Sequence, residues 1–379
     1  MSRLPRVAAV LDRAVATGAV PGAVVHVRAE GRTVHSSAAG VYDADTGHPL
    51  LEDTVFWLAS LSKAIGAAAV LALADDGRLD IADPVSRFIP EFAAPGRVRV
   101  LRAGSPSPFG LPFGPPPDPL PEYDVVAADR ELTLVDLLTH TGGLQSIFRW
   151  NAEFVPPAPG QTLAGYVPGL AGLVRDFQAG QDWAYSNAAS FDVLSRVVEV
   201  ASGQEFGAFV TDRFLAPLGM TASGWGLADH ERAMPLPAAF RRDPVPLGTT
   251  YRTSSAGMWA TPADYLQFAE MLRTGGQHEG RQLLSESAVQ RMTSNQVAEL
   301  CPGLNGREPA PGVGFGLAVA VLDDPLAAGE ALPAGTFGWD GIGTRRFWVS
   351  RDGGWSLFLY APDVRVQRDL EAAVAAELG

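Results

Sequence analysis

Cysteine is nearly absent from this sequence of 379 residues. The single Cys301 excludes an intrachain disulfide and a zinc site built on several cysteines. The six histidines are scattered without metal-ligand spacing, and no phosphate-binding loop or dinucleotide fingerprint occurs. We therefore expect a protein without a metal ion or other cofactor, and we expect His140 to be a structural histidine at a helix end.

Long apolar runs and a positive net charge are missing as well. No run of about 18 uninterrupted apolar residues occurs, which argues against a transmembrane span. Arg6, Asp12 and Arg13 interrupt the first segment, so it does not resemble a secretory signal, and a cytoplasmic location is expected. The formal net charge of −13 opposes binding to nucleic acid and to anionic lipid. The expected partner is a small molecule, and the oligomeric state is left open.

Lysine is the third scarce residue, because Lys63 is the only lysine among the 29 basic residues. A genomic bias toward arginine codons accounts for this scarcity without any function. However, arginine does not lose its proton in a protein, whereas a desolvated lysine does. Lys63 is therefore the first position at which we expect proton-transfer chemistry.

Apolar residues are plentiful and follow both helical and strand patterns. Hydrophobic residues make up 47% of the chain and charged residues 19%, which is enough for a large core. Helical patterns occur at 3–17, 60–79, 133–140, 191–202, 206–214, 261–274, 286–293 and 363–378, and strand patterns occur at 21–32, 33–47, 312–322, 344–350 and 354–362. This order predicts an α/β fold of the α+β type.

The two ends of the chain are expected to share one antiparallel sheet. Residues 1–80 and 290–379 would form this sheet, with the first and last helices on one face. Residues 81–289 would form an inserted, mainly helical part, and the active site would lie in the cleft between the two parts. The proline-rich segment 104–124 is expected to be an irregular surface loop, with a plain excursion favoured over a gate on the substrate.

The segment FWLASLSKAIG, residues 56–66, contains the first candidate for chemistry. Ser60 and Lys63 are three residues apart and so share one face of a helix. Apolar neighbours would lower the pKa of Lys63 by desolvation, so that its amine could take the proton of the Ser60 hydroxyl. Ser62 would point away from Ser60. The alternative is a chance S-x-x-K at a helix start, but no serine lies in the competing G-x-S-x-G motif.

A second candidate is WAYSNAASF, residues 183–191, in which Tyr185 and Asn187 are two residues apart. On an extended loop this spacing places both side chains on one side. A phenol near an ammonium group loses its proton more readily and can relay protons, while an amide both donates and accepts hydrogen bonds. The alternative is a buried tyrosine and an asparagine that caps the next helix.

A third candidate is TFGWDGIGTRRFWV, residues 336–349, in which glycines flank Trp339 and Asp340 before a strand-like run. Gly341 permits close backbone approach, so a substrate could lie along this strand edge. The alternative is an ordinary turn with Trp339 in the core.

Taken in order, these three segments resemble the penicillin-recognising serine hydrolases. That superfamily includes class C β-lactamases, DD-peptidases and the family VIII carboxylesterases. The segments LLTHTGGL (137–144), FLAPLGMTASGW (214–225) and SSAGMWATPADYLQFAEMLRTGG (254–276) are also similar to it. The resemblance spans nearly the whole chain and implies the β-lactamase/transpeptidase-like fold.

The resemblance also implies a role for each candidate residue. Ser60 would be the acylated nucleophile, Lys63 its general base and Tyr185 the proton relay. Asn187 would contact the acyl side of the substrate, and the residues Trp339, Asp340 and Gly341 would line the substrate site. The backbone N–H groups of Ser60 and Ile342 would form the oxyanion hole.

The triplet Trp339-Asp340-Gly341 departs from the Lys-Thr-Gly of lactamases and peptidases and is closer to the Trp-Gly-Gly of family VIII esterases. Without that lysine, a substrate carboxylate loses its cation. Arg345 or Arg346 could replace it, but strand alternation lets only one of them face the cleft. The expected activity is hydrolysis of small or short-chain uncharged esters. The alternatives are a β-lactamase, a D-amino-acid amidase or peptidase, an acyltransferase with the same acyl-enzyme, and a non-catalytic ligand-binding protein.

Overall fold

The computed structural model describes residues 4–43, 47–93, 96–105, 122–145, 157–228, 230–236, 250–297, 300 and 311–379. Most of the proline-rich segment 104–124, as well as Cys301, lies outside the described residues.

One sheet of seven antiparallel strands organises the fold, in the order β2-β1-β13-β12-β11-β10-β9. Its strands are β1 (Gly22–Ala29), β2 (Arg32–Gly40), β9 (Val313–Phe315), β10 (Ala320–Leu322), β11 (Phe337–Gly341), β12 (Arg345–Ser350) and β13 (Trp355–Tyr360). The central strands β12 and β13 are buried along their whole length, because helices cover both faces of the sheet.

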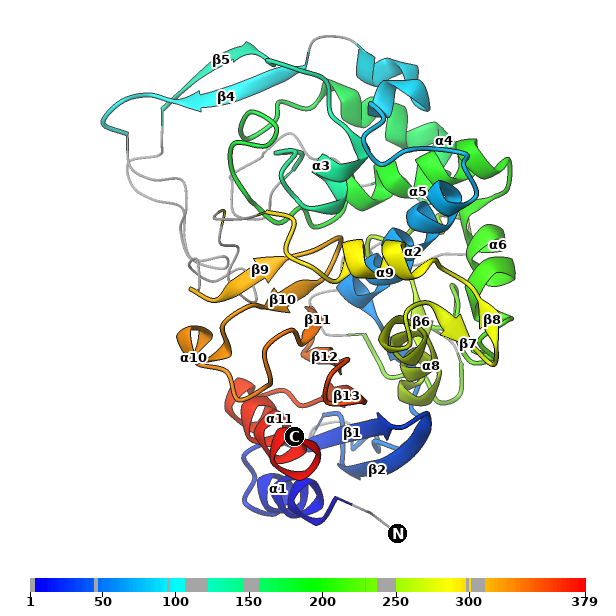
Figure 1. The fold of residues 1–379 in the computed structure, drawn as a ribbon, viewed down its shortest axis with the longest axis vertical. Coiled ribbons are helices and arrows are strands. Elements are labelled where there is room, and N and C mark those ends of the chain that lie inside the picture. Colours follow the sequence, from blue (N-terminus) through cyan, green and yellow to red (C-terminus); the bar gives the residue numbers. More distant parts are fainter. Residues whose placement is uncertain are drawn as a thin grey trace.

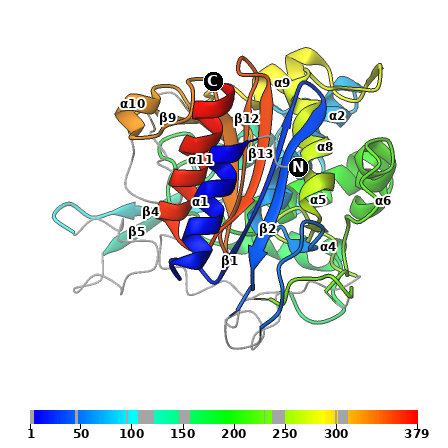
Figure 2. The ribbon, with the colours of Figure 1, turned by 90° about the horizontal axis from the view of Figure 1, so that it is seen from below.

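The first and last helices lie side by side on one face of this sheet (Figure 2). They are α1 (Pro5–Ala16) and α11 (Val364–Leu378). The opposite face is covered by α8 (Pro262–Arg273), which contacts β1, β12 and β13. Thr261 caps α8 through the Asp264 N–H, and Pro262 occupies its first turn. The expected α+β sheet with both terminal helices on one face is confirmed.

The remaining helices lie mainly above the sheet in Figure 1. They are α2 (Ser62–Asp75), α3 (Leu134–Leu138), α4 (Leu163–Tyr166), α5 (Ala189–Ser202), α6 (Phe206–Val210), α9 (Glu286–Met292) and α10 (Pro325–Ala328). The short strands are β3 (Phe56–Trp57), β4 (Arg97–Leu101), β5 (Tyr123–Ala127), β6 (Trp259–Ala260), β7 (Gln277–His278) and β8 (Arg281–Gln282). Although α8 falls within the range 81–289, it packs on the sheet rather than among these helices.

Helix α2 is buried among other helices. It contacts α5, α6 and α9, and the residues Ser62–Leu73 are all buried. Small alanine side chains make up much of its surface, so neighbouring elements approach from every side. Lys63 is the only charged side chain in this buried stretch, which makes it an exception that calls for an explanation.

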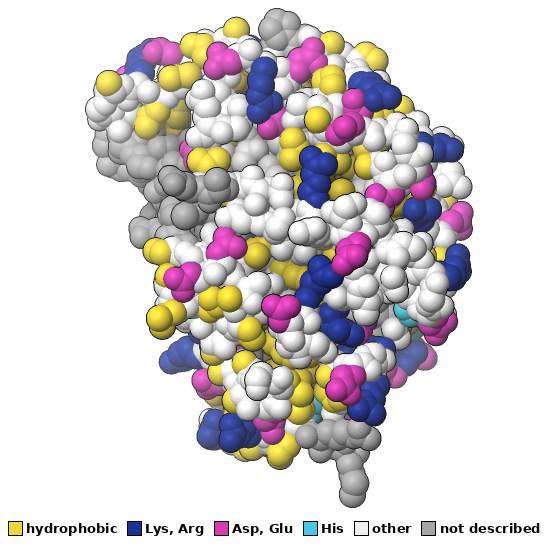
Figure 3. Space-filling model, in the orientation of Figure 1, with side chains coloured by type: hydrophobic (Ala, Val, Ile, Leu, Met, Phe, Trp, Pro, Cys, Tyr) yellow, Lys and Arg dark blue, Asp and Glu magenta, His cyan; other side chains and the backbone are white. Residues whose placement is uncertain are grey.

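The surface offers no broad charged region on the face drawn in Figure 3, where acidic and basic side chains are interspersed. Within the described ranges, no helix is long and apolar enough to cross a membrane. In the same ranges, no group of three or more His, Cys, Asp or Glu residues is arranged to hold a metal ion.

Candidate active site

Ser60 lies in a strained turn between a short strand and α2. Strand β3 pairs with β6, and the 3₁₀ turn Ala59–Leu61 follows. Ala59 has φ of +48°, a left-handed conformation that costs an alanine roughly 1–2 kcal/mol. Ser60 is partly exposed, whereas its chain neighbours are buried. The nearby Ser62 is fully buried, and its Oγ accepts a hydrogen bond from Met258 N–H, so Ser60 is the accessible hydroxyl.

Lys63 points at Ser60 and is held by two backbone carbonyls. Its Nζ lies 3.3 Å from Ser60 Oγ and donates to the carbonyl oxygens of Asn187 and Ser255, each at 2.6 Å. A neutral amine has two N–H groups and one lone pair. Because the two carbonyls take the two N–H groups, the lone pair is left for the Ser60 hydroxyl.

The surroundings of Lys63 favour that neutral form. Burial lowers the pKa of Lys63 to about 7, and the charge of Asp192 opposes the decrease. At neutral pH a large fraction of the amine is therefore unprotonated. Gly66, one turn further along α2, allows this packing, since a Cβ there would lie 2.3 Å from the Cβ of Ser254. The close approach brings the next residue, Ser255, within reach of Lys63.

Tyr185 completes the polar group around Ser60. Its hydroxyl hydrogen-bonds with Ser60 and accepts a hydrogen bond from Trp339 Nε1 at 3.2 Å. Burial raises the pKa of Tyr185 above its ordinary value, although these two hydrogen bonds act in the opposite direction. The expectation that a neighbouring ammonium would acidify this phenol is wrong. Desolvation of the phenolate outweighs the hydrogen bonds, and Lys63 is itself partly neutral.

His140 holds the segment that carries Tyr185, a role that the sequence did not reveal. Its carbonyl accepts from Ala184 N–H at 3.2 Å, and its Nδ1 accepts from Ser186 N–H at 3.1 Å. Its ring centroid lies 4.4 Å from that of Tyr185. Burial, together with the charge of Lys63, holds the pKa of His140 well below its usual range, so the ring is neutral with its proton on Nε2. His140 thus fixes the backbone on both sides of Tyr185.

The backbone conformation and the sequence position of His140 both point to a structural role for this residue. Its φ of +61° is unusual for a residue with a side chain, and it follows Thr139, the residue that caps the end of α3. In the sequence, His140 lies between the end of a helix and the pair Gly142-Gly143, where a sharp turn is expected. A histidine rather than a glycine at such a turn indicates that its side chain has a role.

The triplet lies on β11, at the edge of the same site. Trp339 stacks on Tyr185 with ring centroids 5.2 Å apart. Asp340 faces the other side of the sheet, because it is directly opposite Arg346 in the register. Gly341 contacts the turn before α2, and a Cβ at this position would lie 2.7 Å from the carbonyl oxygen of Leu58. The exposed Ile342 follows immediately, in the turn to β12.

Two more expected residues have defined positions. Asn187 contributes its carbonyl to Lys63, and its side chain is exposed. Of the two arginines that could have replaced the missing lysine, Arg346 pairs with Glu371 of α11. Arg345 points to the opposite side of the sheet but is fully buried, and it donates to the Ile342 carbonyl at 2.7 Å. Alternation therefore separates the two arginines as expected, yet neither is presented to a ligand.

This arrangement supports nucleophilic catalysis. An accessible hydroxyl, a partly neutral amine beside it and a protonated phenol together provide a nucleophile, a base and a proton donor. Glycine at 341 brings the backbone of β11 against the turn that carries Ser60.

Comparisons with known proteins identify the family and the fold. Residues 7–378 match the protein family described as Beta-lactamase. Esterase EstB of Burkholderia gladioli is 32% identical over 388 aligned positions, which cover 93% of this chain and 89% of EstB.

Two solved structures share the fold. EstCE1, described as a hydrolase with promiscuous acyltransferase activity, superposes with a TM-score of 0.76 at 23% identity, over 99% of this chain and 98% of its own. Simvastatin synthase (LovD) from Aspergillus terreus has a TM-score of 0.75 at 19% identity, over 100% of this chain and 99% of its own. At these identities the likeness establishes the architecture alone.

Proposed function

The chain belongs to the beta-lactamase family and is a serine hydrolase, and from this premise we propose that it is a carboxylesterase that forms an acyl-enzyme on Ser60. The observation that carries the proposal is the position of Lys63. Its Nζ lies 3.3 Å from Ser60 Oγ, and two carbonyls leave its lone pair free for that hydroxyl. EstB, a relative at 32% identity, is named an esterase, which supports esters as the substrate class.

In the acylation step, neutral Lys63 takes the Ser60 proton as Oγ attacks the ester carbonyl carbon. The oxyanion that forms is stabilised by the backbone N–H groups of Ser60 and Ile342. When the tetrahedral intermediate collapses, the bond to the alkoxide breaks, and the alkoxide takes a proton from the Tyr185 hydroxyl. The Lys63 ammonium then returns a proton to Tyr185. The raised pKa of Tyr185 suits it as a donor, because it stays protonated until a strong base forms.

In the deacylation step, water replaces the alcohol. Lys63, neutral again, accepts a proton from the water through Tyr185, and the hydroxide attacks the acyl carbonyl. Collapse of the second intermediate breaks the bond to Ser60 Oγ, which regains its proton from Lys63. The carboxylic acid leaves. Trp339 and the exposed side chain of Asn187 border the substrate in this scheme.

Uncharged esters fit this site better than penicillins or peptide C-termini. Those substrates carry a carboxylate, which needs a cation beside the nucleophile. Position 339 holds tryptophan, Arg346 is paired with Glu371, and Arg345 is fully buried against the Ile342 carbonyl. The site therefore lacks a presented cation among the described residues.

Ser60→Ala tests the assignment. We expect it to abolish turnover of p-nitrophenyl acetate and butyrate and to prevent the acyl adduct in intact-mass spectra. Ser62→Ala is the matched control and should keep most of the activity, because the Ser62 hydroxyl only accepts from Met258 N–H. Full activity in Ser60→Ala would refute the proposal. Faster turnover of nitrocefin or a D-Ala ester than of simple esters would favour the lactamase or peptidase alternatives.

A further inference from the structure

A cavity of about 240 Å³ shares no lining residue with the group around Ser60. Its walls come from the turn before β4, the segment after β5 and the 3₁₀ segment Val167–Gly172. Most of the lining is apolar: Phe92, Ala93, Leu132, Leu144, Leu170, Ala171 and Leu173. The charged residues in the lining are Arg130, Glu131 and Arg175.

Arg175 is the unusual member of this lining. It is only 4% exposed, and its Nη1 is buried with no hydrogen-bond partner in the part of the chain that the structure describes. Both backbone polar groups of Arg175 are hydrogen-bonded: its N–H donates to the Arg97 carbonyl, and its carbonyl accepts from Arg99 N–H. A buried guanidinium without a partner is costly, because its lost hydration is not replaced.

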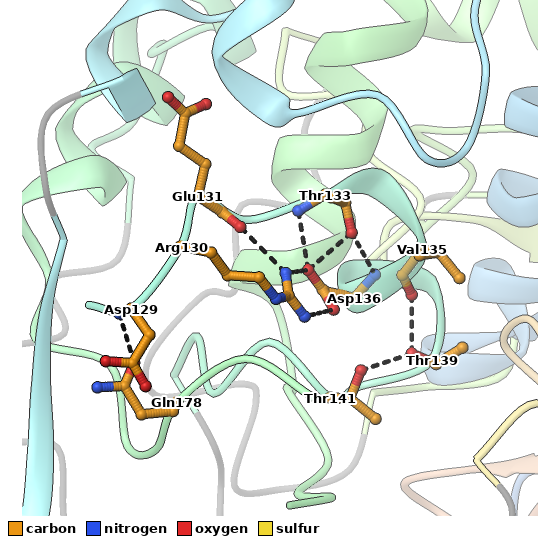
Figure 4. Close-up of polar contacts among 9 residues, drawn as sticks. All are labelled: Asp129, Arg130, Glu131, Thr133, Val135, Asp136, Thr139, Thr141 and Gln178. Carbon is orange, nitrogen blue, oxygen red and sulfur yellow. Dashed lines mark hydrogen bonds and ion pairs between the residues drawn. The ribbon is translucent and has the colours of Figure 1, made fainter. Parts of the chain in front are cut away.

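The carboxylate of Asp136, whose charge acts on Arg175, is already paired with another cation, Arg130. Both oxygens of Asp136 accept from the guanidinium of Arg130, and Thr133 donates to the same carboxylate through its N–H and its hydroxyl (Figure 4). Burial lowers the pKa of Arg175, while the charges of Asp136 and Arg130 shift it in opposite directions. The Arg130–Asp136 pair is thus neutral as a whole, and among the described residues no carboxylate forms an ion pair with Arg175.

Glu131 does not supply the missing anion either. Its side chain is exposed, its carboxylate accepts a hydrogen bond from Ser86, and its carbonyl accepts from Arg130. An apolar cavity with one unpaired cation in its wall matches a molecule with an apolar body and one anionic end.

We propose that this cavity binds a small aliphatic monocarboxylate, with its carboxylate on Arg175 and its chain against the leucines and Phe92. A cavity of about 240 Å³ has room for a short aliphatic chain, and hexanoate is the probe of this class that we choose. The site is distinct from the acyl-enzyme site and does not depend on the assignment of Ser60.

Titration calorimetry with hexanoate tests the proposal, with hexanamide as the neutral probe of the same shape. We expect one molecule of hexanoate to bind the wild-type chain and also Ser60→Ala. Hexanamide should bind at least about tenfold more weakly, because it cannot make a charge-assisted hydrogen bond.

Two variants locate the binding. Arg175→Met removes the charge and keeps an unbranched side chain, whereas Ala171→Phe fills the cavity and leaves Arg175 in place. Each should weaken hexanoate binding at least about tenfold. Without ligand, Arg175→Met should unfold at the same or a higher temperature than the wild type, because it removes an unpaired buried charge.

The opposite results overturn the proposal. Unchanged hexanoate affinity in Arg175→Met, equal binding of hexanamide, or no binding at all would each contradict it. A large loss of thermal stability in Arg175→Met, or a failure to fold, would show that Arg175 already has its counter-charge within the protein. In that case Ala171→Phe decides whether the cavity takes any ligand.

Discussion

Lys63 and Arg346 are two buried cations whose surroundings lead to opposite outcomes. Lys63 contacts two backbone carbonyls and the Ser60 hydroxyl, and burial lowers its pKa to about 7. Arg346 is also opposed by burial, but Glu371, 3.0 Å away, and Asp340 outweigh that effect and raise its pKa. A buried lysine that contacts only dipoles can become a base, whereas the Arg346 guanidinium, which contacts a carboxylate, stays charged.

The comparison also separates catalysis from stability. The Arg346–Glu371 pair joins β12 to α11 on the far face of the sheet, and Trp348 Nε1 donates to the same carboxylate. Its role is to satisfy buried polar groups. Lys63 lies where β11, α2 and the segment before α5 converge. At this place its amine can exchange a proton with the Ser60 hydroxyl.

The largest effect is expected from Lys63→Arg, which turns the labile cation into a permanent one. Because arginine does not give up its proton, kcat for p-nitrophenyl acetate should fall by about 10³-fold, within the range lost with a general base. Lys63→Met is the control for charge and should be equally impaired. Retention of activity within about tenfold in Lys63→Arg would contradict the role of a neutral amine.

Removal of the Arg346–Glu371 ion pair should lower the stability of the fold and leave catalysis intact. Glu371→Gln leaves Arg346 without its carboxylate and should lower the free energy of unfolding by about 3 kcal/mol, measured by urea denaturation. Adding Arg346→Met to this variant should recover most of the loss, because the buried cation that Glu371 neutralises is gone. Activity per folded molecule should stay near the wild-type value. A loss that the second substitution does not reverse would argue against the pair.

His140 is expected to show a smaller effect on catalysis, through the position of Tyr185. His140→Leu removes the Nδ1 acceptor for Ser186 N–H and should lower kcat by up to about 10²-fold, with little change in KM. His140→Asn supplies a side-chain acceptor and tolerates the φ of +61°, so it should retain more activity. Equal activities of the two variants would mean that His140 only fills space.

The smallest effect, and the sharpest test of the comparison, is a shift in pH dependence. The base must be neutral, so kcat/KM should rise with pH through the Lys63 pKa of about 7. The charge of Asp192 raises that pKa, so Asp192→Asn should move the midpoint of the rise to lower pH by about one unit.

The same shift can be observed without substrate. Because Lys63 is the only lysine, protein labelled with ¹³C-lysine gives one side-chain signal whose titration reports this pKa directly. An NMR midpoint near the ordinary lysine value, or a shift toward higher pH in Asp192→Asn, would be incompatible with the proposed base.

The sequence predicted the parts of the site that are local. A spacing of three residues, from the 3₁₀ turn into α2, sufficed to bring Ser60 and Lys63 together, and alternation along β12 sufficed to separate Arg345 from Arg346. The antiparallel sheet and both terminal helices also followed from apolar periodicity. The order of the motifs indicated the family that the comparisons bear out.

Long-range contacts could not be predicted in the same way. The carbonyls that hold Lys63 belong to Asn187 and Ser255, which are 124 and 192 residues away along the chain. Backbone carbonyls have no residue signature, so no pattern reveals them. The direction of the Tyr185 pKa was wrongly predicted for a related reason, since burial depends on everything packed around the ring.

The sequence by itself determined which groups can react: one lysine, a serine on its helical face and a tyrosine far along the chain. Only the tertiary structure decided their state. Desolvation and hydrogen bonding are sums over neighbours from many segments, and within the described ranges those neighbours favour a neutral Lys63, keep Tyr185 protonated and leave Arg175 Nη1 without a hydrogen-bond partner.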